Sequence, residues 1–406
     1  MRAPSGIDTS VPVVVLNLFD HGSLGIARSL GRWGVAVHGV HDRRTSASRS
    51  RYLRSFHRFD GAFTDPRLIA FLEQLSGRLG GRPVLIPTSD AACLAVEDHA
   101  AELAEWFRFP PQPAGLARAL SSKSGMHELC AAHGVPTPAT IFPRARSEVE
   151  SYAVRGAFPV MLKAIDGYVQ EQRDKKRMVV ARSADQLLSA YDELEHPARP
   201  NLMIQEYVPG DAASVWIVNG YFGPDAQSTV SFTGKMLHQC PPATGSTSLG
   251  VCQANAEVEA LTLRFMRDLG YRGILDCDFR FDSRDGRYKL LDVNPRVGAS
   301  FRLFVGPDGS DVVKALYLNL TGQPVAPATL DEGRKWVVES NDLVSFALAR
   351  SDGRPRAAEW LRSFRGVQEA AWWALDDPVP AAAVSAELLR RAGKHRRWRR
   401  GSALRR

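Results

Sequence analysis

Asp278, Asp292 and Asn294 are the side chains whose types and spacing most clearly predict chemistry. All three would lie on one face of a β-hairpin, with the two aspartates directly opposite each other. Two ionised carboxylates held this close raise each other's pKa unless a positive charge lies between them. Oxygen ligands of this kind suit Mg²⁺ or Mn²⁺, which retain water and bind substrate phosphates. The pattern predicts a divalent metal site; the alternative is a solvated polar face with turn-forming aspartates.

The hairpin that would position these side chains consists of two runs that alternate with a period of two, 274–281 and 287–294. Turn-forming residues at 282–286 separate them. An odd-length loop centred on Asp285 gives the register in which the two aspartates face each other. The other face would be apolar and suited to a core, and it would carry Cys277, Phe279, Phe281, Leu291 and Val293.

The first part of the chain has the pattern of an α/β domain. The continuous apolar run at 11–19 is typical of a strand buried on both faces, and a helix-length segment joins it to a second strand near 35–40. A third short strand is predicted at 83–87, followed by a helical run to residue 106. These elements predict a parallel sheet flanked by helices.

A second domain is expected to begin near the proline-rich break at 135–138. Strands are predicted at 159–163, 178–182 and 202–208, with a charged loop after the first and a helix near 184–194. The pattern becomes less regular after residue 322.

The net charge of +8 comes from the C-terminus, because residues 390–406 contain nine Lys or Arg and no acid. This tail is either a solvated terminus or a segment that contacts an anionic membrane surface; a nucleic-acid partner is the least favoured reading. The longest apolar stretch is about half of what a bilayer span requires. We therefore expect a cytoplasmic protein, with the inner membrane face as a peripheral alternative. The five scattered cysteines predict reduced, structural thiols.

Four motifs, in order and spacing, resemble the ATP-grasp superfamily and specifically its carboxylate–amine ligase-like members. They are SSKSGMHELCAAHGVPTP (121–138), PVMLK (159–163), LMIQEYVPG (202–210) and LLDVNPR (290–296). The resemblance implies an N-terminal Rossmann-like parallel-sheet domain, a two-subdomain ATP-grasp fold and a small C-terminal α/β extension. The implied boundaries are 1–115 for the N-terminal domain, 116–325 for the ATP-grasp domain (lid 135–207, metal-bearing subdomain 208–325), 326–389 for the extension and 390–406 for the basic tail.

The resemblance also implies roles for individual residues. Lys123 and Lys163 match the family's phosphate-binding lysines, and Asp278, Asp292 and Asn294 match its Mg²⁺ ligands. The hinge that would face adenine comprises Gln205, Glu206, Tyr207 and Val208, with Glu206 at the adenine amino group, and Asp211 lies where a ribose-binding acid is often found. Three basic residues are expected near the reacting groups: Arg296 on the phosphate or acyl phosphate, Lys235 toward the phosphates or acceptor, and Arg302 on a substrate carboxylate. Ser89 and Asp90 are expected near the acceptor site.

Two features depart from the family pattern. Asp292 stands where the family usually has Glu, so its carboxylate is one methylene shorter. The loop after Lys163 has a single glycine, Gly167, and carries basic residues in place of a glycine-rich run. These basic residues are Arg173, Lys175, Lys176 and Arg177.

The implied function is ATP-dependent ligation of a small-molecule carboxylate to an amine through an acyl phosphate, with ATP and Mg²⁺ or Mn²⁺ as cofactors. Three alternatives remain open from the sequence. One is a carboxylase-type ATP-grasp enzyme that activates bicarbonate, and another is a regulatory protein that binds ATP without turnover. The third is a membrane- or nucleic-acid-binding module that depends on residues 390–406. The sequence predicts neither the two substrates nor an oligomeric state.

Overall fold

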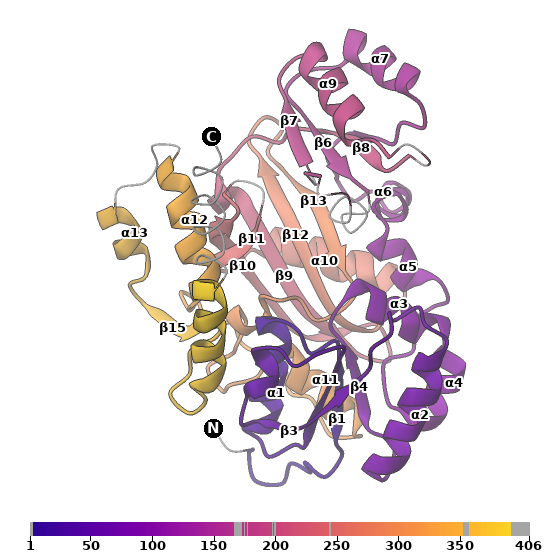
Figure 1. Cartoon of the computed structure of the whole chain (residues 1–406), viewed down its shortest axis with the longest axis vertical. Coiled ribbons are helices and arrows are strands. Elements are labelled where there is room, and N and C mark those ends of the chain that lie inside the picture. Colours follow the sequence, from indigo (N-terminus) through magenta and orange to yellow (C-terminus); the bar gives the residue numbers. More distant parts are fainter. Residues whose placement is uncertain are drawn as a thin grey trace, which may run out of the picture.

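The structure is a computed structural model that describes residues 3–165, 173, 175–176, 178–196, 198, 200–242, 245–351 and 357–390. Three sheets organise it (Figure 1). A parallel sheet lies in the N-terminal part, and a small antiparallel sheet lies in the segment that was predicted as a lid and is called the lid below. A seven-stranded sheet lies between them. The predicted mixed α/β architecture is confirmed.

The N-terminal sheet has the parallel order β3-β2-β1-β4. Its strands are β1 (Val13–Leu16), β2 (Val37–His41), β3 (Leu53–Arg58) and β4 (Val84–Pro87). Its helices are α1 (His21–Gly31), α2 (Arg67–Leu79), α3 (Asp90–Asp98) and α4 (Ala100–Trp106), with a short 3₁₀ turn η1 (Ala47–Arg49). Every side chain of β1 is buried: Val13 and Val15 pack with α1, whereas Val14 and Leu16 pack with α2 and α3. A strand buried on both faces explains the continuous apolar run in the sequence.

The lid is an antiparallel sheet with the order β5-β8-β6-β7. Its strands are β5 (Thr140–Ile141), β6 (Val160–Ala164), β7 (Met178–Ala181) and β8 (Leu202–Glu206), and its helices are α7 (Arg146–Arg155) and α9 (Ala184–Leu194). Both helices pack on one face, where Val160 and Leu162 join their core. Because side chains alternate along a strand, Lys163 and Gln205 lie on the other face.

The central sheet has the order β13-β12-β9-β10-β11-β14-β15. Its strands are β9 (Val215–Phe222), β10 (Ser228–Cys240), β11 (Ser246–Cys252), β12 (Gly273–Asp282), β13 (Arg287–Asn294), β14 (Lys335–Val337) and β15 (Val367–Ala370). Around it lie α5 (Leu116–Ser121), α6 (Lys123–Ala132), α10 (Ala256–Asp268), α11 (Val312–Leu320), α12 (Glu339–Ser351), α13 (Ala357–Ser363), and the 3₁₀ turns η2 (Ala212–Ser214) and η3 (Phe301–Leu303).

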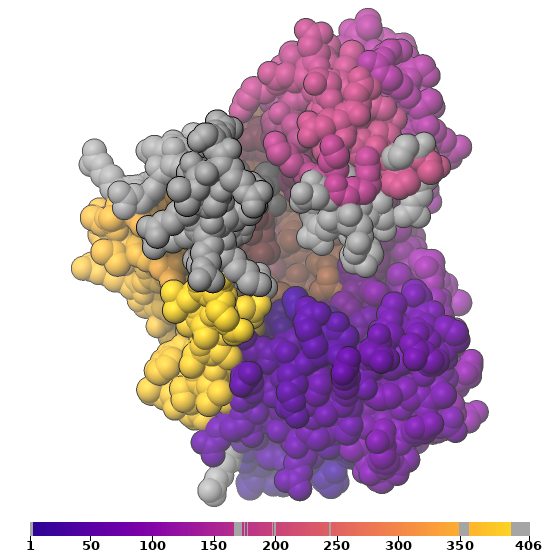
Figure 2. Space-filling model, viewed as in Figure 1, coloured from indigo at the N-terminus to yellow at the C-terminus, as the bar shows by residue number. Residues whose placement is uncertain are grey.

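The two faces of this sheet pack against different layers. Helices α5, α6 and α10 cover one face, and α11 with α1 of the N-terminal unit covers part of the other. Strands β14 and β15 come from the segment predicted as an extension, so that segment completes the central sheet. The space-filling view is hollowed between the magenta lid and the indigo N-terminal unit, with orange residues at the floor (Figure 2).

The five cysteines form no disulfide, and all but Cys240 are buried, as expected of structural thiols. No helix within the described ranges is long and apolar enough to cross a membrane. Sequence analysis did not predict β3, because this half-exposed edge strand has only two apolar residues, Leu53 and Phe56, and they do not alternate with a period of two.

Candidate active site

The metal-ligand hairpin has the predicted pairing, with Asp278 directly opposite Asp292. The predicted loop, however, was wrong. Asp282 pairs with Arg287, so the turn spans four residues, and the register shifts by one between Asp278 and Phe279. This bulge supplies the extra residue that an odd-length loop was expected to supply.

The bulge also changes which leucine enters the core. Leu290 pairs with Phe279 and is completely buried, whereas Leu291 is only half-buried. Leu291 was expected on the apolar face, and that expectation was wrong because the bulge shifts the alternation by one residue. Cys277, Phe279 and Val293 lie in the core as predicted.

Asp276 is a third carboxylate of the site that the sequence reasoning missed. It lies opposite Asn294, is 5% exposed, and accepts a hydrogen bond from Asn219 Nδ2 at 3.4 Å. Burial raises the pKa of Asp276 to about 6. The signal was present, because Asp276 precedes Asp278 by two residues and alternation therefore puts both on one face.

The three carboxylates influence one another. Burial raises the pKa of Asp278 well above its usual range, and the negative charges of Asp276 and Asp292 raise it further. Asp278 and Asp292 with the Asn294 amide form an all-oxygen donor set of the kind that suits Mg²⁺. Among the described residues, no group of three or more His, Cys, Asp or Glu is placed to bind a metal.

The two lysines that the resemblance implies as phosphate-binding residues lie beside these carboxylates. Lys123, the first residue of α6, donates from Nζ to Asp292 Oδ1 at 2.5 Å. Lys163 on β6 donates to Gln205 Oε1 at 2.6 Å. Burial and the charge of Lys123 lower the pKa of Lys163 to about 8, while Asp292 opposes the shift. The two lysines therefore lie close enough to repel each other across the space between the lid and the central sheet.

Two further polar groups near the lysines lack partners. Within the described part of the chain, Arg280 Nε and His127 Nε2 are buried with no hydrogen-bond partner. Burial and the charges of Lys123 and Lys163 lower the pKa of His127 to about 4. Arg280 lies on the carboxylate face, two residues from Asp278, and its Nη2 donates to the carbonyls of Gly210 and Asp211. Sequence alternation could have identified Arg280; nothing in the sequence singled out His127.

The predicted hinge, residues 205–208, begins with the last two residues of β8 and leads from the lid to the central sheet. Glu206 pairs with Arg284 at 2.5 Å and Lys289 at 3.2 Å, both from the metal-ligand hairpin. Gln205 is buried between Lys163 and Thr140, and Val208 is buried, whereas Tyr207 is half-buried. These contacts occupy the Glu206 carboxylate, which was expected at adenine.

Asp211 follows the hinge and has a structural contact of its own. Its carboxylate accepts from the backbone N–H of Ser214 and so caps η2, while the side chain remains exposed. A ribose contact by Asp211 stays a prediction.

Arg296 joins the metal-ligand hairpin to the N-terminal unit. Its Nε donates to Asp90 Oδ1 at 2.5 Å and its Nη2 to Asn294 Oδ1 at 3.0 Å. Ser89 caps α3 by accepting from the N–H of Ala92. Asp90 thus reaches the candidate site, as expected of a residue at the end of β4.

The structure gives Lys235 an environment different from the expected one. It pairs across the sheet with Trp216, which pairs with Phe279, and both aromatic residues lie in the core opposite the carboxylate face. Its Nζ lies 4.4 Å from the centre of the Trp216 ring. We therefore leave Lys235 out of the proposed site.

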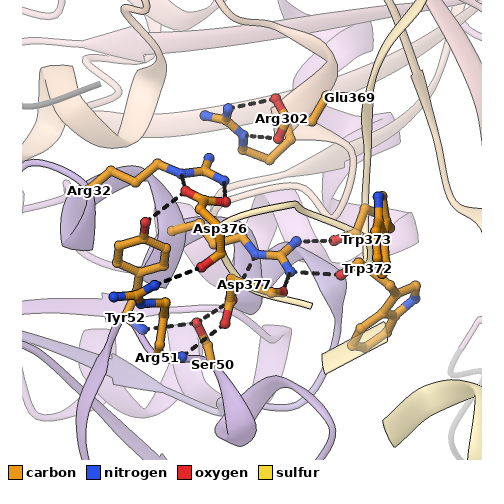
Figure 3. Close-up of polar contacts among 12 residues, drawn as sticks. Arg32, Ser50, Arg51, Tyr52, Arg302, Glu369, Trp372, Trp373, Asp376 and Asp377 are labelled. Atoms are coloured by element: carbon orange, nitrogen blue, oxygen red, sulfur yellow. Dashed lines mark hydrogen bonds and ion pairs between the residues drawn. The ribbon is translucent and has the colours of Figure 1, made fainter. Parts of the chain in front are cut away.

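Arg302 also differs from the expectation, because its guanidinium pairs with carboxylates of the protein itself. Its guanidinium donates to both oxygens of Glu369, at 2.8 and 2.7 Å (Figure 3). It also donates to Asp311 at 2.8 Å. The side chain is 7% exposed, and the carboxylates hold its pKa above the usual range despite burial. We therefore leave Arg302 out of the proposed catalytic set as well, because its donors are already used within the protein.

The basic loop after Lys163 is only partly described. Arg173 donates from its two terminal nitrogens to the carbonyls of Leu194 and Glu195, at the end of α9. Lys175 and Lys176 are described, whereas Gly167 and Arg177 lie outside the described residues. A role of this loop over the phosphates stays a prediction.

Comparison with known proteins finds ligases among the similar sequences. No family model matches the chain. Over 240 residues it is 26% identical to a D-aspartate ligase of Enterococcus faecium, covering 57% of each chain. It is 27% identical over 212 residues to a D-alanine–D-alanine ligase of Gloeobacter violaceus, covering 48% of this chain and 66% of the relative. The chain thus spans less than two thirds of the length of either relative.

Solved structures match most of the chain. N5-carboxyaminoimidazole synthetase from Staphylococcus aureus aligns with a TM-score of 0.61 at 13% identity, covering 80% of this chain and 81% of that one. An L-amino acid ligase from Bacillus licheniformis aligns with a TM-score of 0.58 at 12% identity, covering 79% and 76%. The order of the sheets and these likenesses agree, and the chain has the ATP-grasp fold.

Proposed function

We propose that the protein is an ATP-dependent carboxylate–amine ligase that forms an amide bond and releases ADP and phosphate. The observation that carries the proposal is the juxtaposition of two oppositely charged groups. Lys123 and Lys163 stand beside Asp278 and Asp292, and the direct contact of Lys123 with Asp292 joins the two groups. A nucleoside triphosphate with a divalent metal ion needs both groups, because its phosphates pair with positive side chains and its metal ion with carboxylates.

The chain's own residues would act by binding and orientation. Lys123, Lys163 and the unpartnered Arg280 Nε would hold phosphate oxygens, which are acceptors for all three. The backbone of 206–208 would face adenine. Arg296, held in place by Asp90 and Asn294, would stabilise the negative charge that develops on the transferring phosphoryl group.

The proposed metal ligands are Asp278, Asp292 and Asn294. Asp276 would orient Asn294, which it faces across the hairpin. A bound Mg²⁺ would neutralise phosphate charge and favour displacement at phosphorus.

The chemical steps need no protein nucleophile. An oxygen of the substrate carboxylate attacks the γ-phosphorus, the bond from that phosphorus to the bridging oxygen breaks, and ADP leaves with the electron pair. The amine then attacks the carbonyl carbon of the acyl phosphate. The bond from that carbon to the phosphate oxygen breaks, phosphate leaves with the electron pair, and the amine nitrogen loses a proton. The names of the relatives suggest amino acids, including D-aspartate and D-alanine, as the first substrates to test.

The metal assignment is tested by Asp292→Asn, with Asp285→Asn as the matched control. Asp285 belongs to the same hairpin but lies in its exposed turn. We expect Asp292→Asn to lower Mg²⁺-dependent ADP release by at least about a hundredfold while the far-ultraviolet circular dichroism spectrum stays unchanged. Turnover at the wild-type level in Asp292→Asn, or an equal loss in both variants, would overturn the assignment.

A further inference from the structure

A cavity of about 200 Å³ lies where the N-terminal unit meets the central sheet. One wall comes from the end of β4 and from α3, and another from the start of β12. The segment 109–117 and the three residues 295–297, which follow the metal-ligand hairpin, complete it. An apolar cavity of about 150 Å³ is enough to hold benzene, so this cavity has room for a small organic molecule.

The lining is mainly apolar. Aliphatic, aromatic and proline side chains face the cavity, among them Leu85, Ile86, Val96, Phe109, Pro110 and Leu316. Cys93 contributes an uncharged thiol to the lining. The thiol donates to the carbonyl of Pro295 at 3.3 Å, and burial raises its pKa to about 12. An occupant would therefore gain affinity mainly by removing apolar surface from water.

The charged side chains that line the cavity carry a net positive charge. Glu97 is the acidic residue, and its two oxygens already accept from the backbone N–H groups of Ala117 and Arg118 at 2.8 and 3.0 Å. The two basic residues are Arg272 and Arg296. Glu97 is engaged at the start of α5, and Arg296 already donates to Asp90, Asn294 and the carbonyl of Val297. Arg272 is therefore the basic side chain of the lining that an anionic group entering the cavity would meet.

Arg272 has an unused donor. Its Nε is buried, and no hydrogen-bond partner for it exists among the residues that the structure describes. The Nη1 contact with the Pro111 carbonyl is long, at 3.4 Å. Leaving a buried guanidinium donor unpaired is costly, whereas a carboxylate accepts from it readily.

We propose that this cavity binds a small amphiphile, with an apolar body in the cavity and a carboxylate paired with Arg272. The site is distinct from the proposed nucleotide site, because Lys123, Lys163 and the hinge do not line it. The two sites share only Arg296. The inference does not rest on the ligase function, since it concerns binding alone.

The test compares octanoate with octanamide, which has the same length but no charge. Binding is measured by isothermal titration calorimetry below the concentration at which octanoate forms micelles. We expect the wild-type protein to bind octanoate about tenfold more tightly than octanamide, because only the carboxylate pairs with a charged donor. Equal binding of the two compounds, or no binding of octanoate, would overturn the proposal.

Two variants locate the binding. Arg272→Gln is expected to bind both compounds with the same weak affinity, whereas the matched control Arg287→Gln, at an exposed site outside the cavity, should keep the preference. Ala100→Trp fills the cavity from the half-buried start of α4 and should abolish binding of both compounds. Thermal melting confirms that each variant is folded. Octanoate binding at wild-type strength in Ala100→Trp, or loss of the preference in Arg287→Gln, would contradict the proposal.

Discussion

At the scale of single residues, Lys163 combines burial with a neighbouring positive charge. Its pKa of about 8 means that the free protein loses this charge progressively as the pH rises above 8. A phosphate binds the protonated amine, so ATP affinity should fall over the same range. In Lys163→Arg the side chain at this position stays charged at these pH values. The variant therefore distinguishes the titration of Lys163 from that of other groups.

We expect the dissociation constant of ATP for the wild-type protein to increase about tenfold between pH 7 and pH 9. In Lys163→Arg the affinity should be weaker at pH 7, because the geometry differs, but nearly constant with pH. Calorimetric titration at several pH values measures both. The same pH dependence in the two proteins would show that Lys163 is not the titrating group.

Gly298 is a second residue whose type the site requires. A Cβ at this position would lie 2.2 Å from Asp276 Oδ2 and would displace that buried carboxylate. Gly298→Ala should therefore lower Mg²⁺ affinity and ADP release about tenfold or more. Gly77→Ala is the control, because a Cβ on that residue of α2 meets nothing within 4 Å. It should leave turnover unchanged; a comparable loss in both variants would contradict the role of Gly298.

At the scale of elements, the β12–β13 hairpin is where the sequence was most informative. Alternation correctly paired Asp278 with Asp292, because strands that are apolar on one side specify their register strongly. The bulge could not be predicted, since Leu290 and Leu291 are adjacent and either could face the core. The same alternation would have revealed Asp276, which was overlooked.

The hairpin also holds the hinge in place through charged contacts. Asp282 is completely buried and pairs with Lys289 at 2.6 Å and with Arg284 at 2.6 Å, while Glu206 of the hinge joins both basic residues. These hydrogen bonds and burial, acting in opposite senses, leave the pKa of Asp282 below its usual range. The network therefore links the lid to the metal-ligand hairpin.

Lys289→Met should reduce the free energy of unfolding by about 2 kcal/mol, because it removes one charged partner of a buried carboxylate. Arg287→Met, on the same strand but exposed, should change it by less than about 0.5 kcal/mol. Urea unfolding measures both variants. Equal stabilities would show that the buried pair contributes little.

At the scale of the whole molecule, the C-terminal part is joined to the N-terminal unit by buried polar contacts. Asp377 is 1% exposed and pairs with Arg28, which also donates to the carbonyls of Ala371 and Trp372. Ser50 Oγ and the N–H of Arg51 donate to the same carboxylate. Sequence reasoning could not find these partners, because more than 300 residues separate them.

Neighbouring aspartates allow a matched test of this junction. Asp377→Ala should lower the free energy of unfolding by about 3–5 kcal/mol, because it leaves the Arg28 guanidinium buried without its counter-charge. Asp376→Ala should lower it by about 1 kcal/mol or less, since the side chain is 43% exposed. Urea unfolding compares the two variants. A loss as small in Asp377→Ala as in Asp376→Ala would contradict this account of the junction.

The basic tail remains a prediction from sequence, because residues 391–406 lie outside the described part of the chain. Arg302 illustrates the same limit at long range. Its partner Glu369 lies 67 residues away on β15, and only the folded sheet brings them together. Fold class and the metal-ligand hairpin can be predicted from local periodicity. Whether a basic side chain pairs within the protein or stays available to a substrate depends on such distant partners.

The most direct test of the proposed ligase is Mg²⁺-dependent ADP release by the full chain. Pooled carboxylates that include D-aspartate and D-alanine are supplied alone, with pooled amines, and in parallel with bicarbonate alone. We predict ADP release that requires both a carboxylate and an amine, and an amide product detected by mass spectrometry. ADP release with bicarbonate alone, or ATP binding without turnover in every mixture, would contradict the proposed function.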